Sequence, residues 1–264
     1  MSTYVLSDIH GQYFAYKKML EKIKFKDDDF LYVLGDCIDR GPDGIRILKD
    51  VKNRKNAELI VGNHELMLLN ALQYFKERED NHVGTSSSEE SLNAFELWTH
   101  PCNGGEGTCL EFLSMPKSEQ DEMEAYLRSL RLIKRIKVGM KTYHLSHSFS
   151  VPKQFGKEVW FSKASPSVVE SVVWESLFDK KRIVVPGEKI FGYQRDTYIV
   201  GHIFTQRLEN MDSDGRGRIF KSDNYKGYKV IDIDCGMALN SKSSQLGCMC
   251  IETGEEYYVS LLED

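Results

Sequence analysis

Residues 30–41 read FLYVLGDCIDRG, an apolar run that gives way at once to glycine, acidic residues and arginine. The apolar part, 30–34, is typical of a strand buried on both faces, and Gly35 marks its end. Shorter apolar runs at 4–6 and 59–61 are followed by the same kind of polar residues. We therefore expect three buried strands, each of which ends in side chains that can do chemistry.

The segments between and after these three runs have the residue spacing of amphipathic helices. Apolar residues recur three and four positions apart in the segments 13–24, 43–54 and 65–78. Strands that alternate with helices in this order build a mostly parallel sheet with helices packed on it. The sequence thus predicts an α/β fold.

The middle of the chain changes character, and its last half returns to strands. Ser91 is expected to cap a helix that runs to Trp98, and a further helix is expected over 117–133. We interpret residues 80–133 as a helical insertion over the sheet and residues 1–264 as a single domain. The later strands are predicted at 141–146, 198–200, 228–233, 248–251 and 257–259.

The composition excludes several classes of protein. The chain has 264 residues, of which 41% are hydrophobic, and a formal net charge of −5, as is typical of a globular protein. That charge gives no global positive field for nucleic acid or an anionic membrane. No apolar run could span a bilayer, the N-terminus shows no secretion signal, and the six cysteines form no CxxC pair. We therefore expect a cytoplasmic protein whose partners are neither nucleic acids nor membranes.

Asp, His or Asn follows each of five predicted strands, and ligands in open α/β sheets collect at such strand ends. Asp8 and His10 are two residues apart, so in an extended chain they point the same way and can coordinate one cation. The two carboxylate oxygens of Asp36 could bridge two cations. Carboxylate, imidazole and amide ligands without thiolate fit Mn²⁺, Fe or Zn²⁺. Two ions about 3.5–4 Å apart can stabilise both the attacking and the leaving oxygen when a phosphoryl group is displaced. The expected ligands are Asp8, His10, Asp36, Asn63, His147 and His202.

Three blocks in this set are recognisable: DIHG at 8–11, GDCIDRG at 35–41 and GNHE at 62–65. They resemble the signature blocks of the calcineurin-like metallophosphoesterases, specifically the serine/threonine protein phosphatase (PPP) family of bacterial and phage type. The later segments WTHPCNGGEGT, LSHS, VGHIFTQ and IDIDCG are similar to the same family, so the resemblance runs from Asp8 to Gly236. It implies a central β-sandwich flanked by helices, an αββα arrangement.

The resemblance also implies a role for each site residue. A hydroxide between two divalent ions, Mn²⁺ first and Fe or Zn²⁺ as alternatives, would attack phosphorus. His64 would protonate the leaving oxygen, and Asp39 would orient His64. Arg40 and Asn63 would bind the phosphoryl oxygens. The first ion would take Asp8, His10 and Asp36, and the second Asp36, Asn63, His147 and His202.

The main functional expectation is hydrolysis of phosphomonoesters, with phosphoserine and phosphothreonine in proteins as substrates. The partner would thus be a phosphorylated protein or a small phosphoester. The alternative within enzymes is a dinucleoside polyphosphate hydrolase of the diadenosine tetraphosphate type. The alternative from another class is a non-catalytic regulatory module that binds metal or phosphate.

Two departures from the family pattern concern phosphate binding. Val61 and Ser176 stand where bacterial and phage protein phosphatases carry arginines. Arg182, Lys163 and Lys180 are candidates to replace them, and an arginine placed at Val61 is expected to strengthen phosphate binding. The symmetrical diadenosine tetraphosphate hydrolases also carry an apolar residue near Val61, although their third block ends in Asp where this chain has Glu65.

Overall fold

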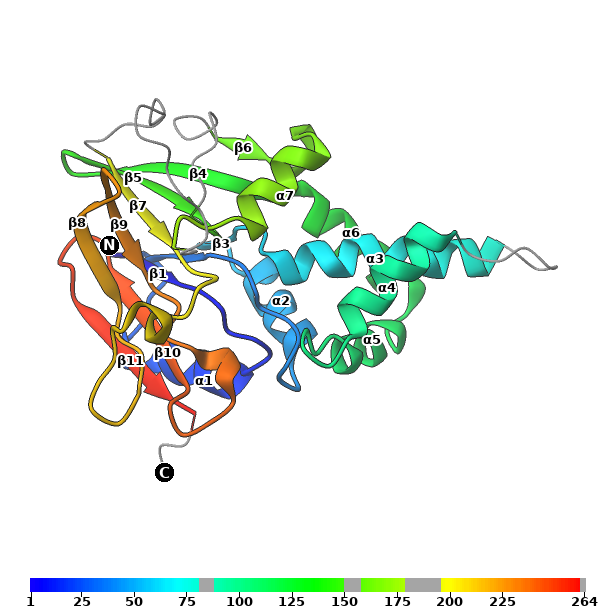
Figure 1. The fold of residues 1–264 in the computed structure, drawn as a ribbon, viewed down its shortest axis with the longest axis horizontal. Helices are drawn as coiled ribbons and strands as arrows, with labels where there is room; N and C mark the ends of the chain where they lie inside the picture. Colours follow the sequence, from blue (N-terminus) through cyan, green and yellow to red (C-terminus); the bar gives the residue numbers. More distant parts are fainter. Residues whose placement is uncertain (81–87, 150–157, 179–195, 262–264) are drawn as a thin grey trace.

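The computed structural model describes residues 1–80, 88–149, 158–178 and 196–261. Two mixed β-sheets pack face to face, and helices flank them (Figure 1). This arrangement confirms the β-sandwich flanked by helices that the family resemblance implies. No helix among the described residues is long and apolar enough to cross a membrane.

The first sheet contains the parallel strands expected from the start of the chain. Strands β1, β2 and β3 are parallel, and helices α1 and α2 connect them. Two strands from the end of the chain, β10 and β11, extend the sheet antiparallel on the other side of β1. The bounds of these elements are β1 Thr3–Leu6, α1 Tyr13–Lys22, β2 Phe30–Val33, α2 Gly44–Asn53, β3 Ala57–Leu59, β10 Gln245–Cys250 and β11 Glu256–Ser260.

The second sheet has the strand order β6-β4-β5-β7-β9-β8. Its centre is parallel, because β5 pairs with β7 and β7 with β9 in the same direction. The remaining pairs are antiparallel. The bounds of these strands are β4 Arg131–Val138, β5 Lys141–Ser146, β6 Val159–Trp160, β7 Thr197–Val200, β8 Phe220–Tyr225 and β9 Tyr228–Asp232.

Helices α3 to α6 extend from the sheets to one side, whereas α7 lies near β4 (Figure 1). Helix α4 packs on α3, where the rings of Tyr74 and Phe95 stack at 4.6 Å between centroids. Short 3₁₀ helices complete the described chain. The bounds are α3 Asn63–Asp80, α4 Glu89–Thr99, α5 Glu106–Leu113, α6 Lys117–Ser129, α7 Pro166–Trp174, η1 Phe161–Lys163, η2 Thr205–Leu208 and η3 Met237–Leu239.

Successive side chains of the central strands point to opposite faces of the sheet and pack into two different apolar cores. Val5 points between the sheets, where it joins Leu145 and Ile199. Tyr4 and Leu6 point to the opposite face and join the larger core, to which the flanking helices contribute. Apolar burial on both faces therefore explains why the short strand runs are hydrophobic without a break.

Several sequence-based boundaries were wrong. The helix expected over 117–133 ends at Ser129, because Leu130 adopts extended backbone and β4 begins at Arg131. Ser88, not Ser91, caps α4: the Ser91 N–H donates to the Ser88 hydroxyl at 3.2 Å. The sequence analysis also missed helices α5 and α7 and strands β4, β6 and β8, whose bounds are given above. The six cysteines are free in the structure, and only Cys102 among them is exposed.

Truncating Leu145 tests the packing between the sheets. Leu145 is fully buried in the inter-sheet core, so Leu145→Ala is expected to lower the free energy of unfolding by about 2–5 kcal/mol. Urea denaturation measures this loss. Leu110→Ala is the matched control, because Leu110 is 66% exposed and its truncation should cost less than about 0.5 kcal/mol. Equal losses in the two variants would contradict the assignment of this core.

Candidate functional site

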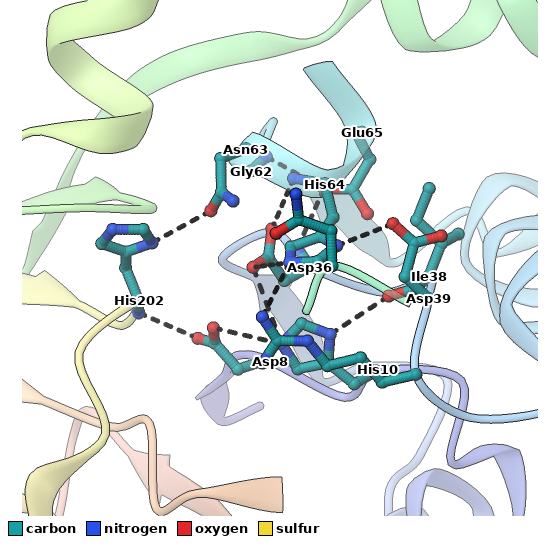
Figure 2. Close-up of polar contacts among 12 residues, drawn as sticks. Asp8, His10, Asp36, Ile38, Asp39, Gly62, Asn63, His64, Glu65 and His202 are labelled. Carbon is teal, nitrogen blue, oxygen red and sulfur yellow. Dashed lines mark hydrogen bonds and ion pairs between the residues drawn. The ribbon is translucent and has the colours of Figure 1, made fainter. Parts of the chain in front are cut away.

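The loops that follow four strands, together with the start of α3, bring the predicted site residues to one place (Figure 2). The loop after β1 carries two of them, the loop after β2 carries three, and α3 begins with two more. One histidine follows β5 and another follows β7. The predicted residues gathered there are Asp8, His10, Asp36, Asp39, Arg40, Asn63, His64, His147 and His202.

The backbone of these loops is held in an uncommon conformation. Ten described residues other than glycine have a positive φ, and six of them belong to the predicted site. Such left-handed backbone costs energy in residues that carry a side chain, and it clusters at functional sites. Gly62 leaves no room for a Cβ, which would collide with the Asp36 carboxylate, and Gly201 is packed in the same way against Asp8. Close packing of the backbone therefore fixes where these two carboxylates lie.

A first group of possible ligand atoms surrounds His10. Its Nε2 lies 3.7 Å from Asp36 Oδ2 and 3.9 Å from Asp8 Oδ1. Ligand atoms of His10, Asp36 and His64 lie within 4.8 Å of one another. The other ring nitrogen of His10, Nδ1, lies 3.2 Å from the Ile38 carbonyl oxygen, which it can satisfy by donating. That hydrogen bond leaves Nε2 with a lone pair toward the carboxylates, as in a metal-ligating histidine.

A second group lies on the other side of Asp36. Ligand atoms of Asp36, His147 and His202 lie within 4.8 Å of one another, and His147 Nε2 is 3.5 Å from Asp36 Oδ1. Asn63 Oδ1 is 2.8 Å from His147 Nε2 and 2.9 Å from His202 Nδ1. His147 Nδ1 lies 2.7 Å from the Leu34 carbonyl oxygen, so its Nε2 again faces the group. Asp36 is therefore shared by both groups, one oxygen on each side.

The protonation chemistry of these residues fits divalent cations. Burial raises the pKa of Asp8 and Asp36 well above the ordinary value, and repulsion from nearby acids adds to the effect. Burial lowers the pKa of His10 and His147, and it lowers the pKa of His202 to about 4. The imidazoles are thus neutral at pH 7, as ligands must be, and the crowded carboxylates need positive charge nearby to ionise. The donor set and its electrostatics fit two divalent ions.

His64 lies beside this centre and belongs to a short chain of polar contacts. Its Nδ1 is 2.7 Å from Asp39 Oδ2, and its Nε2 is 3.3 Å from Arg40 Nη2. Burial raises the pKa of Asp39 to about 7, and burial lowers the pKa of His64 well below its ordinary value. The dyad of His64 and Asp39 that the resemblance implies is therefore formed in the structure, with Arg40 on the other side of the imidazole.

Sequence analysis missed the role of Glu65. Its buried carboxylate accepts the backbone N–H groups of Asp36, Cys37 and Gly62 at 2.9, 2.8 and 3.0 Å (Figure 2). An acidic residue directly after His64, in the first turn of a helix, was the signal that could have indicated it.

The acids of the segment IDIDCG were also missed as site residues. Asp232 and Asp234 are buried, and burial raises the pKa of Asp234 to about 6. Repulsion from Asp234 contributes to the raised pKa of Asp8, so this late strand adds negative charge to the centre. Two acids at the end of an otherwise apolar strand were the signal available in the sequence.

The two departures from the phosphatase pattern do not place cations at the site. Val61 is fully buried in the larger apolar core, and phosphate binding by an arginine placed there stays a prediction. Ser176 is also buried, and its hydroxyl accepts the Phe178 N–H at 3.2 Å. Lys163 is exposed on η1, whereas Lys180 and Arg182 lie outside the described residues.

The sequence has recognisable relatives. The profile of the calcineurin-like phosphoesterase family matches residues 1–203. A symmetrical bis(5'-nucleosyl)-tetraphosphatase of Buchnera aphidicola subsp. Schizaphis graminum is 41% identical over 81 residues, which are 30% of this chain and 30% of that protein. A protein of the same name from Buchnera aphidicola subsp. Acyrthosiphon pisum is 34% identical over 100 residues, 35% of this chain and 36% of that protein. The chain thus spans about a third of the length of these curated relatives.

Solved structures share the fold at low sequence identity. A structure assigned provisionally to a diadenosine tetraphosphatase has a TM-score of 0.57 and 17% identity, and the match covers 98% of this chain and 92% of that one. A protein serine/threonine phosphatase from Saccharomyces cerevisiae has a TM-score of 0.55 and 13% identity, with 100% and 81% covered. These matches support the fold alone.

The raised carboxylate pKa values predict how metal binding depends on pH. The histidine ligands are neutral in the folded chain with or without the ion, so their titration in the unfolded chain affects both forms equally and cancels in the difference. Because the folded pKa values of Asp8 and Asp36 are raised, these two acids hold more protons in the metal-free folded protein than in the unfolded chain, and their contribution to its stability falls as pH rises. A bound ion replaces those protons, so the increase in melting temperature caused by Mn²⁺ should be larger at about pH 8 than at about pH 6.5.

Thermal melts with Mn²⁺ or with a chelator, at both pH values, measure this difference. Asp36→Asn should abolish most of the Mn²⁺-dependent increase, because it removes the charge shared by the two groups. If Mn²⁺ raised the melting temperature equally at both pH values, binding of the ion would not release protons from the carboxylates, and the prediction would be contradicted.

Proposed function

Because the chain belongs to the calcineurin-like phosphoesterase family, we propose that it is a dinuclear metal-dependent hydrolase acting on a dinucleoside polyphosphate of the bis(5'-nucleosyl)-tetraphosphate type. This substrate was the alternative to a phosphoprotein in the sequence analysis. The observation that carries it is the similarity to relatives named as symmetrical bis(5'-nucleosyl)-tetraphosphatases, each over about a third of the chain.

The site residues divide into those that hold the ions and those that handle the substrate. When bound, two divalent ions would lower the pKa of a water molecule and draw charge from the phosphoryl oxygens. We assign Mn²⁺ as the metal, with Fe and Zn²⁺ as alternatives, on the mixed oxygen and nitrogen donor set. The proposed ligands are Asp8, His10, Asp36, Asn63, His147 and His202.

The remaining residues act on the substrate directly. The Arg40 guanidinium, 3.3 Å from His64, offers a planar pair of donors to phosphoryl oxygens, and the Asn63 amide adds a further polar contact. His64 gives a proton to the leaving oxygen from Nε2, while its Nδ1 stays bonded to Asp39. We place these roles within one domain that spans residues 1–264, with 80–133 as a helical insertion.

A phosphoserine or phosphothreonine monoester is the second candidate substrate. Glu65 favours it, because the symmetrical hydrolases that this chain resembles end their third block in Asp.

A substrate panel with added Mn²⁺ separates the candidates. We expect kcat/KM for diadenosine tetraphosphate to exceed that for a phosphopeptide or p-nitrophenyl phosphate by about tenfold or more, because contacts beyond the reacting phosphate add binding energy. Faster turnover of the phosphopeptide would favour the second candidate. A protein that binds two ions and turns over none of the three would favour the regulatory module.

His64→Asn separates proton donation from metal binding. The variant should keep both metals and lose roughly 10²–10⁴ in turnover of an alkyl phosphate, the usual contribution of a general acid. The loss should be smaller for p-nitrophenyl phosphate than for an alkyl phosphate, because p-nitrophenolate leaves without protonation. Metal analysis and kinetics on both esters are the measurements, and equal losses on the two esters would rule out the assigned role.

A further inference from the structure

Helices α4 and α5 reach the candidate site through one buried side chain. Trp98 lies in the last turn of α4 and is fully buried. Its indole N–H points at the Asp39 carboxylate, with Nε1 3.2 Å from Oδ1 and 3.0 Å from Oδ2. The carboxylate that accepts this N–H is also the one that contacts His64 Nδ1 at 2.7 Å. Trp98, Asp39 and His64 therefore form one continuous hydrogen-bonded chain.

Helix α5 holds the backbone of the same acid. The Asp39 N–H donates to the Thr108 hydroxyl oxygen at 3.0 Å, and Thr108 is buried. Asp39 has a φ of 69°, a left-handed conformation that needs local support in a residue with a side chain. Helices α4 and α5 thus restrain both the backbone and the carboxylate of Asp39.

The loop between these helices explains why glycines follow each other there. A Cβ on Gly105 would lie 2.5 Å from Trp98 Nε1 and 2.6 Å from Trp98 Cδ1, so only glycine leaves the indole in place. Gly104 has a φ of +71°, and its carbonyl accepts the Arg40 N–H at 3.1 Å. One short segment therefore supports both Asp39 and the neighbouring arginine.

We propose that Trp98 and Thr108 are positioning residues, which fix Asp39 so that His64 presents Nε2 to the leaving group. This inference rests on the proposed function, since it assigns His64 as the proton donor. A carboxylate with two donors, one from Trp98 and one from His64, cannot rotate without breaking a buried hydrogen bond. Without the indole N–H, Asp39 loses that restraint, and the imidazole loses a fixed direction.

A role in packing alone would also bury a tryptophan, and a double-mutant cycle separates the two roles. Trp98→Phe keeps an aromatic ring and removes the N–H. It should lower kcat about tenfold or more, the usual effect of removing a partner that orients a reacting group. In the His64→Asn background the same substitution should have little further effect on kcat, because the group that Trp98 acts through is gone. A full additional loss in that background would overturn the proposal.

Thr108→Val provides a second and smaller change. It removes the acceptor for the Asp39 N–H with little change of volume, and its loss of kcat should likewise disappear in the His64→Asn background. Trp160→Phe is the matched control, because Trp160 stacks on the Arg131 guanidinium at 3.8 Å and has no described contact with Asp39. It should leave kcat unchanged in both backgrounds.

The leaving group supplies a further readout. If monoesters are turned over, Trp98→Phe should cost more with an alkyl phosphate than with p-nitrophenyl phosphate, and equal costs would count against the proposal. An inactive wild-type protein would refute the proposed function, whereas an active wild-type protein with additive effects of Trp98→Phe and His64→Asn would refute the positioning role alone.

Discussion

The spacing of the candidate centre depends on one buried carboxylate, that of Glu65. By accepting three backbone N–H groups, it ties the loop after β2 to the glycine that precedes α3. Because Asp36 lies on the first segment and His64 on the second, this contact sets the distance between a proposed metal ligand and the proposed proton donor. A carboxylate with three donors tolerates burial, because each N–H it accepts offsets part of its lost hydration.

Several acidic side chains are buried together around the candidate centre. Burial raises the pKa of Asp8, Asp36, Asp39, Glu65 and Asp234. Arg40 and Arg207 oppose these shifts, yet the pKa values of all five acids stay raised. Bound divalent ions would supply positive charge, which would couple metal binding to stability. The left-handed backbone of the loops that carry the proposed ligands is unfavourable, and the binding of ions would offset that free energy.

Local sequence pattern predicted the parts of the molecule that depend on local chemistry. Buried strands such as β1 and β2 appear as unbroken apolar runs, so both were placed nearly to the residue. The polar residues after them converge because parallel strands end together. Trp98 and Thr108, which support the site, could not be found in this way, because they act on an acid that is distant in the sequence. The place of Val61 in the larger core could not be found either, since only packing shows which way a residue after a strand points.

The residues that would carry the proposed reaction do not by themselves determine the choice of substrate. The loops of the two sheets carry the proposed ligands, whereas α4 and α5 support Asp39 and Arg40 from outside the sheets. Arg40 is the described arginine that contacts the proposed proton donor, and its guanidinium can bind the oxygens of a monoester or of an internal phosphate of a polyphosphate chain. An arginine that recognises the reacting phosphate in either substrate cannot discriminate between them. Discrimination must therefore come from contacts to the groups beyond that phosphate, where binding energy can be used to favour one transition state over the other.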